Sequence, residues 1–512
     1  MPSSPSEPEP PADRVHPTGP ADPTDPTGLA DLAVVGAGPA GLAAAVTAAG
    51  LGLRVTLLDA GTRPGGQYYR HPDPALGAAR PEALHHDWSA FARREAALRA
   101  HIAAGRIDYL PGRHVWTLLP AEPAGNDPHG WLLHAVGPDD TAARVRARAV
   151  LLATGAYERQ LPFPGWTLPG VIGAGGAQAM LKGGLVLPGR RVVVAGSGPL
   201  LLAVAGSLAA AGATVPAVVE GASYLGYAGR VPVLLRNPGK LAEGATYGGA
   251  LLRHGVRLLT RHAVTEAHGG TRVEAVTVAR LDKDWRPVPG TARRIPCDAV
   301  AVGHGLVPQL ELATSLGCAT FTSADGTAAL VLDDDQATSV PGIWSAGETG
   351  GIGGAQLALV EGELAALAVA CTVRPSATAA TSAPTPAAPT AADDRRAARL
   401  RRRRARLRGF ADAMAAAHRP GPGWIGWLDD DTDVCRCEEV PAGRIREAVA
   451  DLGARDARTV KLLTRAGMGW CQGRMCGPAV AALTGQDPAA DRRPFSCPVP
   501  LAHLADLPAD GG

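Results

Sequence analysis

The stretch from residue 31 to residue 50, DLAVVGAGPAGLAAAVTAAG, decides the fold. A short apolar run typical of a buried strand leads into Gly36-Ala37-Gly38-Pro39-Ala40-Gly41, and an alanine-rich helical segment follows. In this context Gly36 permits a tight turn, Gly38 lets the backbone approach a pyrophosphate, and Gly41 lets helix and strand pack closely. The helix N-terminus offers free N–H groups to phosphate. The pattern predicts a dinucleotide-binding βαβ unit.

Residues further along the chain complete this predicted site. The next strand, LRVTLLDA, ends near Asp59, whose carboxylate is placed to accept from ribose hydroxyls. Thr154 and Gly155 lie in LLATGA, which resembles the crossover of flavoproteins with two dinucleotide domains. Gly347 and Glu348 lie in GIWSAGE, which resembles the late strand of that fold, although Asp is usual at the position of Glu348. These signals favour FAD over NAD.

A second strand–glycine–helix–strand unit begins about 160 residues later. It holds Gly196-Ser197-Gly198-Pro199-Leu200-Leu201, in which leucine replaces the third glycine, so Leu201 is expected to loosen or re-aim the helix. Glu220 ends the following strand and would accept ribose hydroxyls of NAD while repelling the extra phosphate of NADP. Whether this site holds NAD, another nucleotide or nothing stays open at this point.

Four cysteines near the C-terminus have the spacing of a metal site: Cys435, Cys437, Cys471 and Cys476. Four thiolates can hold a [2Fe–2S] cluster. Structural zinc is the alternative, but it usually takes pairs two to four residues apart, and Cys435-Arg436-Cys437 is tighter. Cys297, Cys318, Cys371 and Cys497 are scattered singly and are expected to be buried thiols. The absence of Cys-x-x-Cys excludes a disulfide reductase built on that motif.

Composition excludes other classes of protein. The net charge of +2 and the aromatic content of 4% argue against nucleic-acid binding. The N-terminal residues carry prolines and acids where a signal peptide needs a basic start and an apolar core, so a cytoplasmic location is expected, with no integral membrane segment. No Ser/His/Asp, Cys/His or paired-carboxylate constellation is found, and no catalytic residue is predicted.

Three further segments have distinctive composition. Residues 1–29 are Pro-rich and acidic and are predicted to be a disordered arm, and an Ala/Thr/Pro-rich linker is predicted near residues 373–395. The arginine run at 395–408 predicts a solvated or docking helix with Leu400 and Leu407 on one apolar stripe.

Longer motifs carry a resemblance that covers most of the chain. RPGGQYYR, ATGAYERQLPFPGWTLPGVIGAGGAQAMLK and AGETGGIGGAQLALVEGELAA resemble a family of FAD/NAD(P)-binding oxidoreductases. This family includes flavoprotein subunits of hydrogen cyanide synthase and opine oxidase, and the α subunits of proline and hydroxyproline dehydrogenases. VCRCEEV and KLLTRAGMGWCQGRMCGP are similar to bacterioferritin-associated ferredoxin.

The resemblance implies an α/β fold of two nested Rossmann-like domains, as in pyridine nucleotide-disulfide oxidoreductases, with a small, mainly helical [2Fe–2S] module at the C-terminus. It places Arg63, Gly65, Gly66 and Gln67 on a loop that borders the flavin. The expected segments are an arm at 1–29, an FAD domain at 30–170 and 291–372, an NAD(P)-like domain at 171–290, a linker at 373–395, a basic helical segment at 396–429, the cluster module at 430–485 and a tail at 486–512.

The resemblance also implies a function. The expected protein is an FAD-dependent oxidoreductase subunit, in which electrons from an amino acid, imino acid or opine oxidised on a glycine-oxidase-like partner subunit pass through FAD and the cluster to an acceptor. A self-contained NADH-dependent reductase, with NADH at Gly196 and Gly198, is the alternative enzyme. A non-enzymatic redox-sensing regulator is the third hypothesis.

Overall fold

The computed structural model describes residues 29–85, 87–121, 130–373, 390–486, 493–505 and 507. Residues 1–28 of the predicted arm, 374–389 of the predicted linker and part of the predicted tail lie outside the described residues. Residues 391–395, predicted as the end of the linker, belong to the helix Ala391–Ala417.

The first domain is built on a mixed sheet. The strands β1 (Ala30–Val35), β2 (Val55–Asp59), β3 (Ile107–Pro111) and β6 (Ala142–Leu152) pair in parallel in the order β3-β2-β1-β6. β19 (Ile343–Ser345) pairs with β6 in parallel, and β4 (His114–Pro120) and β5 (Trp131–Val136) extend the sheet in antiparallel order. The apolar runs of β1 and β6 are buried throughout because the sheet is covered on both faces.

Three helices cover one face of this sheet. α1 (Pro39–Gly50) follows β1, α2 (Trp88–Ala103) precedes β3, and α8 (Ala355–Thr372) packs on α1. A Cβ at Gly362 of α8 would lie 2.0 Å from the carbonyl oxygen of Ala40, so the two helix backbones are in close contact. α8 is long and apolar enough to cross a membrane, but more than half of it is buried inside the fold, as in a core helix.

The second domain contains a parallel sheet of its own. Its strand order is β11 (Arg257–Thr260), β10 (Ala217–Glu220), β9 (Val192–Gly196), β15 (Ala299–Gly303) and β8 (Val171–Gly173). The helices α3 (Ala174–Gly184), α4 (Leu200–Ala210), α5 (Val231–Leu235) and α6 (Pro238–Arg253) belong to this domain, as does the antiparallel sheet of β12 (His262–His268), β13 (Ala275–Arg280) and β14 (Arg293–Pro296). Because β14 and β15 pair within this domain, we propose that it extends to Gly303 and not to residue 290.

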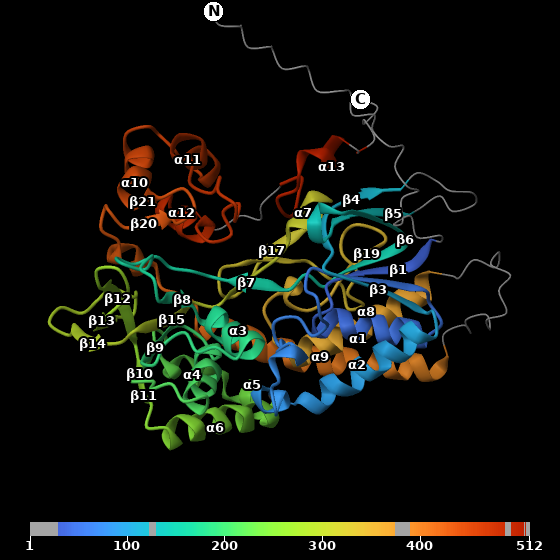
Figure 1. Cartoon of the computed structure of the whole chain (residues 1–512), viewed down its shortest axis with the longest axis horizontal. Helices are drawn as coiled ribbons and strands as arrows, with labels where there is room; N and C mark the ends of the chain where they lie inside the picture. Colours follow the sequence, from blue (N-terminus) through green and yellow to red (C-terminus); the bar gives the residue numbers. More distant parts are fainter. Residues whose placement is uncertain are drawn as a thin grey trace, which may run out of the picture.

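Two antiparallel segments connect the domains. β7 (Ala156–Glu158) runs out of the first domain and pairs with β16 (Leu306–Pro308), which returns to it. β16 is followed by α7 (Glu311–Ser315) and by the hairpin of β17 (Thr320–Thr322) and β18 (Ala328–Leu330). The second domain is therefore inserted into the first, as the nested fold requires (Figure 1).

The C-terminal part begins with the long helix α9 (Ala391–Ala417), which lies along α8 (Figure 1). Leu400 and Leu407 of α9 are buried against Leu357 and Leu364 of α8, which confirms the predicted apolar stripe of a docking helix. The cluster module follows with β20 (Asp433–Cys435), β21 (Val440–Pro441), α10 (Ala442–Ala450), α11 (Ala457–Thr464) and α12 (Gly477–Leu483), and α13 (Leu501–Ala505) ends the described chain.

The module packs on the second domain. Val434, Cys435 and Ile445 share one buried cluster with Trp285 of the second domain and with Trp427, which precedes the module. The indole N–H of Trp166 donates to the carbonyl oxygen of Asp433 at 2.6 Å. The module is therefore held against the oxidoreductase domains by a shared core.

Candidate cofactor sites

The first glycine turn lies at the carboxyl end of β1, and two of its glycines are required by packing. Gly36 has φ +104°, and a Cβ there would lie 2.4 Å from the carbonyl oxygen of Ala153. A Cβ at Gly41 would lie 1.8 Å from the carbonyl oxygen of Gly36. These contacts match the roles predicted for the first and third glycines, namely the tight turn and the close approach of helix and strand.

Gly38 has open space in front of it. A Cβ at this residue would meet no atom within 4 Å, and no side chain caps the N-terminus of α1. The N–H groups of the first turn of α1 are therefore free to bind an anionic group, as a pyrophosphate requires. Ala40 lies behind them, where a Cβ at Gly347 would approach its Cβ to 3.1 Å.

Asp59 lies beside the turn at the end of β2. Its carboxylate accepts from the backbone N–H of Ala37 and, at 2.5 Å, from that of Gly61. Burial raises the pKa of Asp59 above its usual value, and these two N–H donors oppose the increase. The carboxylate is thus fixed at the edge of the glycine turn, and its predicted contact with a ribose stays a prediction.

The backbone of the RPGGQ loop reaches the same turn, whereas its polar side chains do not. The N–H of Gly65 donates to the carbonyl oxygen of Ala37 at 2.8 Å, and a Cβ at Gly66 would lie 2.9 Å from the Cα of Gly38. Arg63 pairs with Asp73 at 2.5 Å. The Gln67 side-chain oxygen accepts from Arg70 at 2.9 Å. The structure therefore brings Gly65 and Gly66 to the turn and engages Arg63 and Gln67 within their own loop.

Thr154 and Gly155 follow β6 at the same edge of the sheet. The Thr154 hydroxyl donates to the carbonyl oxygen of Gln309 at 2.7 Å, and the N–H of Gln309 donates to the carbonyl oxygen of Gly155 at 2.9 Å. Gly155 has φ +77° and adjoins open space. These bonds join the outgoing and returning connections between the two domains beside the first site.

Glu348 begins a short helical turn (Glu348–Gly350) that precedes α8. Its carboxylate accepts from the N–H groups of Gly353 at 2.6 Å and Gly354 at 3.0 Å, and burial raises its pKa. The longer side chain at the position where Asp is usual therefore binds the loop that precedes α8. Gly347 next to it has φ +88° and faces α1.

Glu361, a fully buried carboxylate beside this site, was not predicted from the sequence. Glu361 accepts from the N–H of Gly347 at 3.0 Å and from Arg408 of α9 at 2.7 Å. Arg408 also donates to the carbonyl oxygen of Gly351 at 2.6 Å, and Arg404 approaches Glu361 at 3.3 Å. An acid at helical spacing from the apolar residues Leu357 and Leu364 is the signal that could have identified it.

The second glycine turn has the geometry of the first at Gly196. This residue has φ +134°, and a Cβ would lie 1.7 Å from the carbonyl oxygen of Gly303. Leu201 is buried, and α4 begins at Leu200, one residue after Pro199, whereas α1 begins at Pro39. α4 thus starts one residue later in its turn than α1 does, and the re-aiming of the helix by Leu201 stays a prediction.

Glu220 is directed back onto the second turn. Its carboxylate accepts from the N–H groups of Gly198 at 3.0 Å and Ala222 at 2.9 Å, and it lies 3.4 Å from Nδ1 of His418, a residue beyond the end of α9. Only 1% of Glu220 is exposed. His418 was not predicted from the sequence, since nothing in the local sequence indicates contact with a strand about 200 residues earlier.

The four cysteines of the C-terminal module come together in two pairs. The sulfurs of Cys437 and Cys471 are 3.5 Å apart, and the thiols of Cys435 and Cys476 share a hydrogen bond that lowers the pKa of Cys435 to about 5. Among the described residues, no three His, Cys, Asp or Glu side chains converge closely enough to hold one metal ion. A tetrahedral zinc needs all four ligands at one point, whereas a [2Fe–2S] cluster takes two thiolates on each iron.

The backbone around these cysteines also fits a cluster. The N–H of Gly467 points at the sulfur of Cys435 at 3.4 Å, and a Cβ at Gly469 would lie 2.2 Å from that of Cys437. Donors aimed at cluster sulfurs adjust the reduction potential. Elsewhere, Cys297, Cys318 and Cys497 are buried as predicted. Cys371 is exposed, so the prediction of a buried thiol there was wrong, because the residue lies in the last turn of α8.

The cysteine loop contacts the first domain through Arg474. Its guanidinium pairs with Glu311 of α7 at 2.7 Å and also donates to the carbonyl oxygen of Ser496. Ser496 in turn bonds β4, where its N–H donates to the carbonyl oxygen of Trp116 at 2.9 Å. The loop between Cys471 and Cys476 is therefore fastened to the domain that carries the first site.

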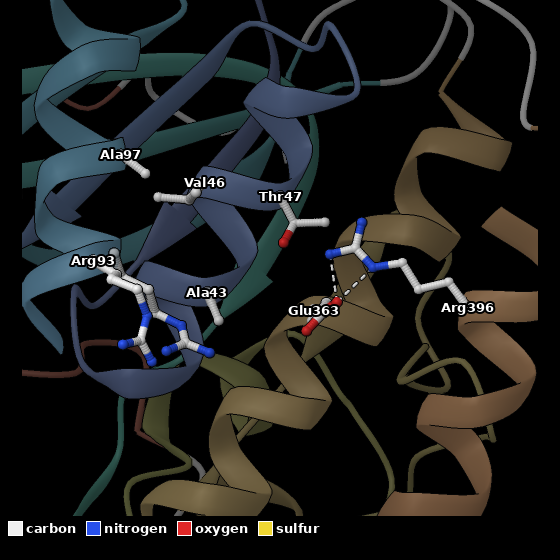
Figure 2. A pocket seen from close by; sticks show the side chains of 8 residues that line it. Ala43, Val46, Thr47, Arg93, Ala97, Glu363 and Arg396 are labelled. Atoms are coloured by element: carbon white, nitrogen blue, oxygen red, sulfur yellow. Dashed lines mark hydrogen bonds and ion pairs between the residues drawn. The ribbon is translucent and has the colours of Figure 1, made fainter. Parts of the chain in front are cut away.

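A cavity of about 270 Å³ lies apart from these sites, between α1, α2, α8 and α9 (Figure 2). Arg93, Arg94 and Arg396 line it, and Arg396 pairs with Glu363. None of the predicted site residues lines this cavity.

Comparison with known proteins identifies the class to which this arrangement belongs. Residues 30–362 match the pyridine nucleotide-disulphide oxidoreductase family, and residues 434–485 match the BFD-like [2Fe-2S] binding domain. The chain belongs to this oxidoreductase family. It is an FAD-dependent oxidoreductase with a [2Fe–2S] domain at its C-terminus.

The sequences of individual relatives align with most of the chain. The sequence is 36% identical to hydrogen cyanide synthase subunit HcnB of Pseudomonas aeruginosa over 86% of this chain and 90% of the relative. It is 35% identical to an opine oxidase subunit of Agrobacterium tumefaciens over 93% and 91% of the two chains. The crystal structure of L-proline dehydrogenase from P. horikoshii has the same fold, with a TM-score of 0.56 at 18% identity over 92% of this chain and 77% of that one. The predicted fold class, family and cofactors are thereby confirmed.

Proposed function

We propose that the chain is the electron-transfer subunit of an amino-acid, imino-acid or opine dehydrogenase. A glycine-oxidase-like flavoprotein subunit would oxidise the C–N bond of the substrate to an imine, which releases two electrons and two protons. When bound, FAD accepts electrons in pairs and can release them singly, and a [2Fe–2S] cluster carries one electron at a time. The substrate class and the partner rest on the relatives, two of which are named as enzyme subunits.

The observation that carries the proposal is the attachment of the cysteine loop to the flavin-binding domain. Arg474 lies between Cys471 and Cys476 and pairs with Glu311, which follows the connection that is bonded to Gly155. Both partners are largely buried, so their ion pair is shielded from water. The contact holds the module in a fixed position relative to the first glycine turn, which suits a stable path between two redox groups.

The residues predicted for each cofactor have distinct tasks in this proposal. Gly36, Gly38 and Gly41 admit the pyrophosphate of FAD to the N-terminus of α1, and Asp59 holds its ribose. Gly65, Gly66, Thr154, Gly155, Gly347 and Glu348 shape the remaining walls, with Ala40 beneath them and Arg63 and Gln67 fixing the loop. Cys435, Cys437, Cys471 and Cys476 hold the cluster. None of these residues is assigned acid–base chemistry.

The expected cytoplasmic location is also part of the proposal. The apolar helix α8 is an internal element of the first domain, packed between α1 and α9.

The test compares two electron donors. The purified chain is mixed with an artificial one-electron acceptor and either NADH, or an opine together with a glycine-oxidase-like flavoprotein subunit. The proposal predicts acceptor reduction only with the opine and the partner subunit. Rapid NADH oxidation by the single chain would instead establish the self-contained reductase, and partner binding without electron transfer in either mixture would favour a regulator.

A further inference from the structure

The end of α9 lies on the second glycine turn. The Ser197 hydroxyl donates to the backbone carbonyl oxygen of His418 at 2.9 Å, and the imidazole Nδ1 of His418 lies 3.4 Å from Glu220. The second imidazole nitrogen lies 2.7 Å from the hydroxyl of Tyr227. His418 is therefore bonded at both ring nitrogens and through its backbone, beside the carboxylate that was predicted to accept from a ribose.

Two tyrosine rings pack against the imidazole of His418. Tyr224 and Tyr227 stack on each other and both meet the imidazole edge-on, with ring centroids 6.1 and 5.7 Å from it. A Cβ at Gly226 would lie 3.6 Å from the Cβ of Ala417, so η4 (Tyr224–Arg230) packs directly against the end of α9. His418 itself is only 8% exposed.

The first glycine turn provides an internal comparison. Gly36 and Gly38 are both partly exposed, as is Asp59. At the equivalent positions of the second turn, Gly196, Gly198 and Glu220 are all buried. Gly36 and Gly196 both have positive φ, whereas Gly38 has φ −69° and Gly198 has φ +115°. A Cβ at either Gly38 or Gly198 would meet no atom within 4 Å, so the two turns differ chiefly in what surrounds the acid that follows the second strand. The covering residues at the second turn come from this chain.

We propose that His418 closes the second dinucleotide site, so that the folded chain does not take up NAD or NADP there. The imidazole adds a third contact to the Glu220 carboxylate, beside the N–H groups of Gly198 and Ala222, and stands where ribose hydroxyls would otherwise bind it. A dinucleotide can enter only if the end of α9 leaves the turn. The site is thus a dinucleotide-binding fold that is occluded by the chain itself, and this inference does not depend on the proposed electron relay.

The test measures nucleotide binding by calorimetry with NADH and NADPH as the probes. Wild-type protein is expected to bind neither at concentrations up to about 1 mM. His418→Ala should bind NADH at least roughly tenfold more tightly, and should favour NADH over NADPH because Glu220 repels a 2′-phosphate. His254→Ala, which changes an exposed histidine of the same domain, is the control and should behave as wild type.

A second, more conservative variant tests the proposal if His418→Ala does not fold. Tyr227→Phe keeps the ring and removes the hydroxyl that holds the imidazole, and it should allow measurable NADH binding while FAD absorbance stays unchanged. Tight NADH binding by the wild type would overturn the proposal and leave the relay intact. The absence of binding by both variants, with FAD content and unfolding temperature preserved, would also overturn it, since His418 would then not be what excludes the nucleotide.

Discussion

Gly38 and Gly41 are separated by two residues, yet the structure tolerates a side chain at only one of them. A methyl group at Gly41 would overlap the carbonyl oxygen of Gly36, at 1.8 Å, whereas at Gly38 it would enter open space. Gly41 is therefore constrained by the protein alone and Gly38 by what binds beside it.

Two alanine variants should separate these constraints. Gly41→Ala should lower the free energy of unfolding of the apoprotein by about 1–3 kcal/mol, because α1 must move away from β1. Gly38→Ala should lower it by less than about 1 kcal/mol. Gly38→Ala should nevertheless weaken FAD binding at least roughly tenfold, because the methyl group occupies the approach of the pyrophosphate. Urea unfolding and FAD titration measure the two effects. Equal FAD affinity in Gly38→Ala and wild type would contradict the assignment of the turn.

At this scale the sequence predicted what is encoded locally. The glycine turns, Asp59, and the four cysteines were identified from spacing, because each task needs a particular residue type within a short motif. Glu361, Arg408 and His418 were not, because their partners lie 14 to 221 residues away in the sequence. The side-chain directions of Arg63 and Gln67 were also inaccessible, since they depend on hydrogen bonds within a folded loop.

At the scale of elements, α9 connects the two dinucleotide turns. Arg408 of α9 binds Glu361 and the carbonyl oxygen of Gly351 beside the first site. His418, the residue after the end of α9, covers the second site. The arginine run predicted a solvated or docking helix, and the structure shows the docked form. Composition could indicate a helix with an apolar stripe, but not that its arginines would reach a buried carboxylate.

Removal of Arg408 tests this connection. Arg408→Ala leaves the fully buried Glu361 with one arginine in place of two, so we expect a loss of about 3 kcal/mol in the free energy of unfolding. FAD should also bind more weakly, because Glu361 orders the N–H of Gly347. Arg403→Ala, at an exposed position of the same helix, is the matched control and should be neutral. An Arg408 variant as stable as this control would show that the ion pair does not stabilise the docked helix.

At the scale of the whole molecule, the second domain and the cluster module share a core around His304. This residue is buried, with its ring centroid 6.2 Å from that of Trp285 and 6.4 Å from that of Trp427. Burial lowers its pKa to about 3, and the nearby charge of Arg159 acts in the same direction. This packing indicates a structural role for His304.

Acid should therefore loosen this interface. Below pH 6.5 the unfolded chain protonates His304 and the folded chain does not, so the free energy of unfolding falls as the pH drops from about 6.5 to about 3, by up to about 1.4 kcal/mol per pH unit. His304→Phe should remove this contribution and make the pH dependence shallower. His254→Phe should leave the slope unchanged. A slope that is equal in the His304 variant and the wild type would show that the imidazole is not kept neutral by the fold.

We expect that the cluster can be removed from the C-terminal module while FAD stays bound. Cys471→Ser should lose most iron and acid-labile sulfide, because one thiolate of the Cys437–Cys471 pair is gone. FAD content should be unchanged, since the contacts of the module with the first domain lie at Glu311 and β4 and not at the glycine turn. Cys371→Ser, at an exposed cysteine, is the control. Stoichiometric zinc without iron in protein prepared without oxygen would contradict the cluster.

The domain order was predictable because each module has its own motif, whereas the docking of the module was not. The linker predicted near residues 373–395 suggested a separate unit. The shared core of Trp285, Trp427 and Cys435 arises only from side chains that meet in the folded chain.

The most direct measurement of the electron relay is the rate at which the wild-type chain and Cys471→Ser reduce a one-electron acceptor. Each is combined with an opine and its glycine-oxidase-like partner, and each is also tested alone with NADH. The account predicts that reduction requires the partner and the opine, that it falls at least roughly tenfold in Cys471→Ser at equal FAD content, and that NADH does not replace them. Rapid reduction by the wild-type chain with NADH alone, or an undiminished rate in the cluster-free variant, would contradict it.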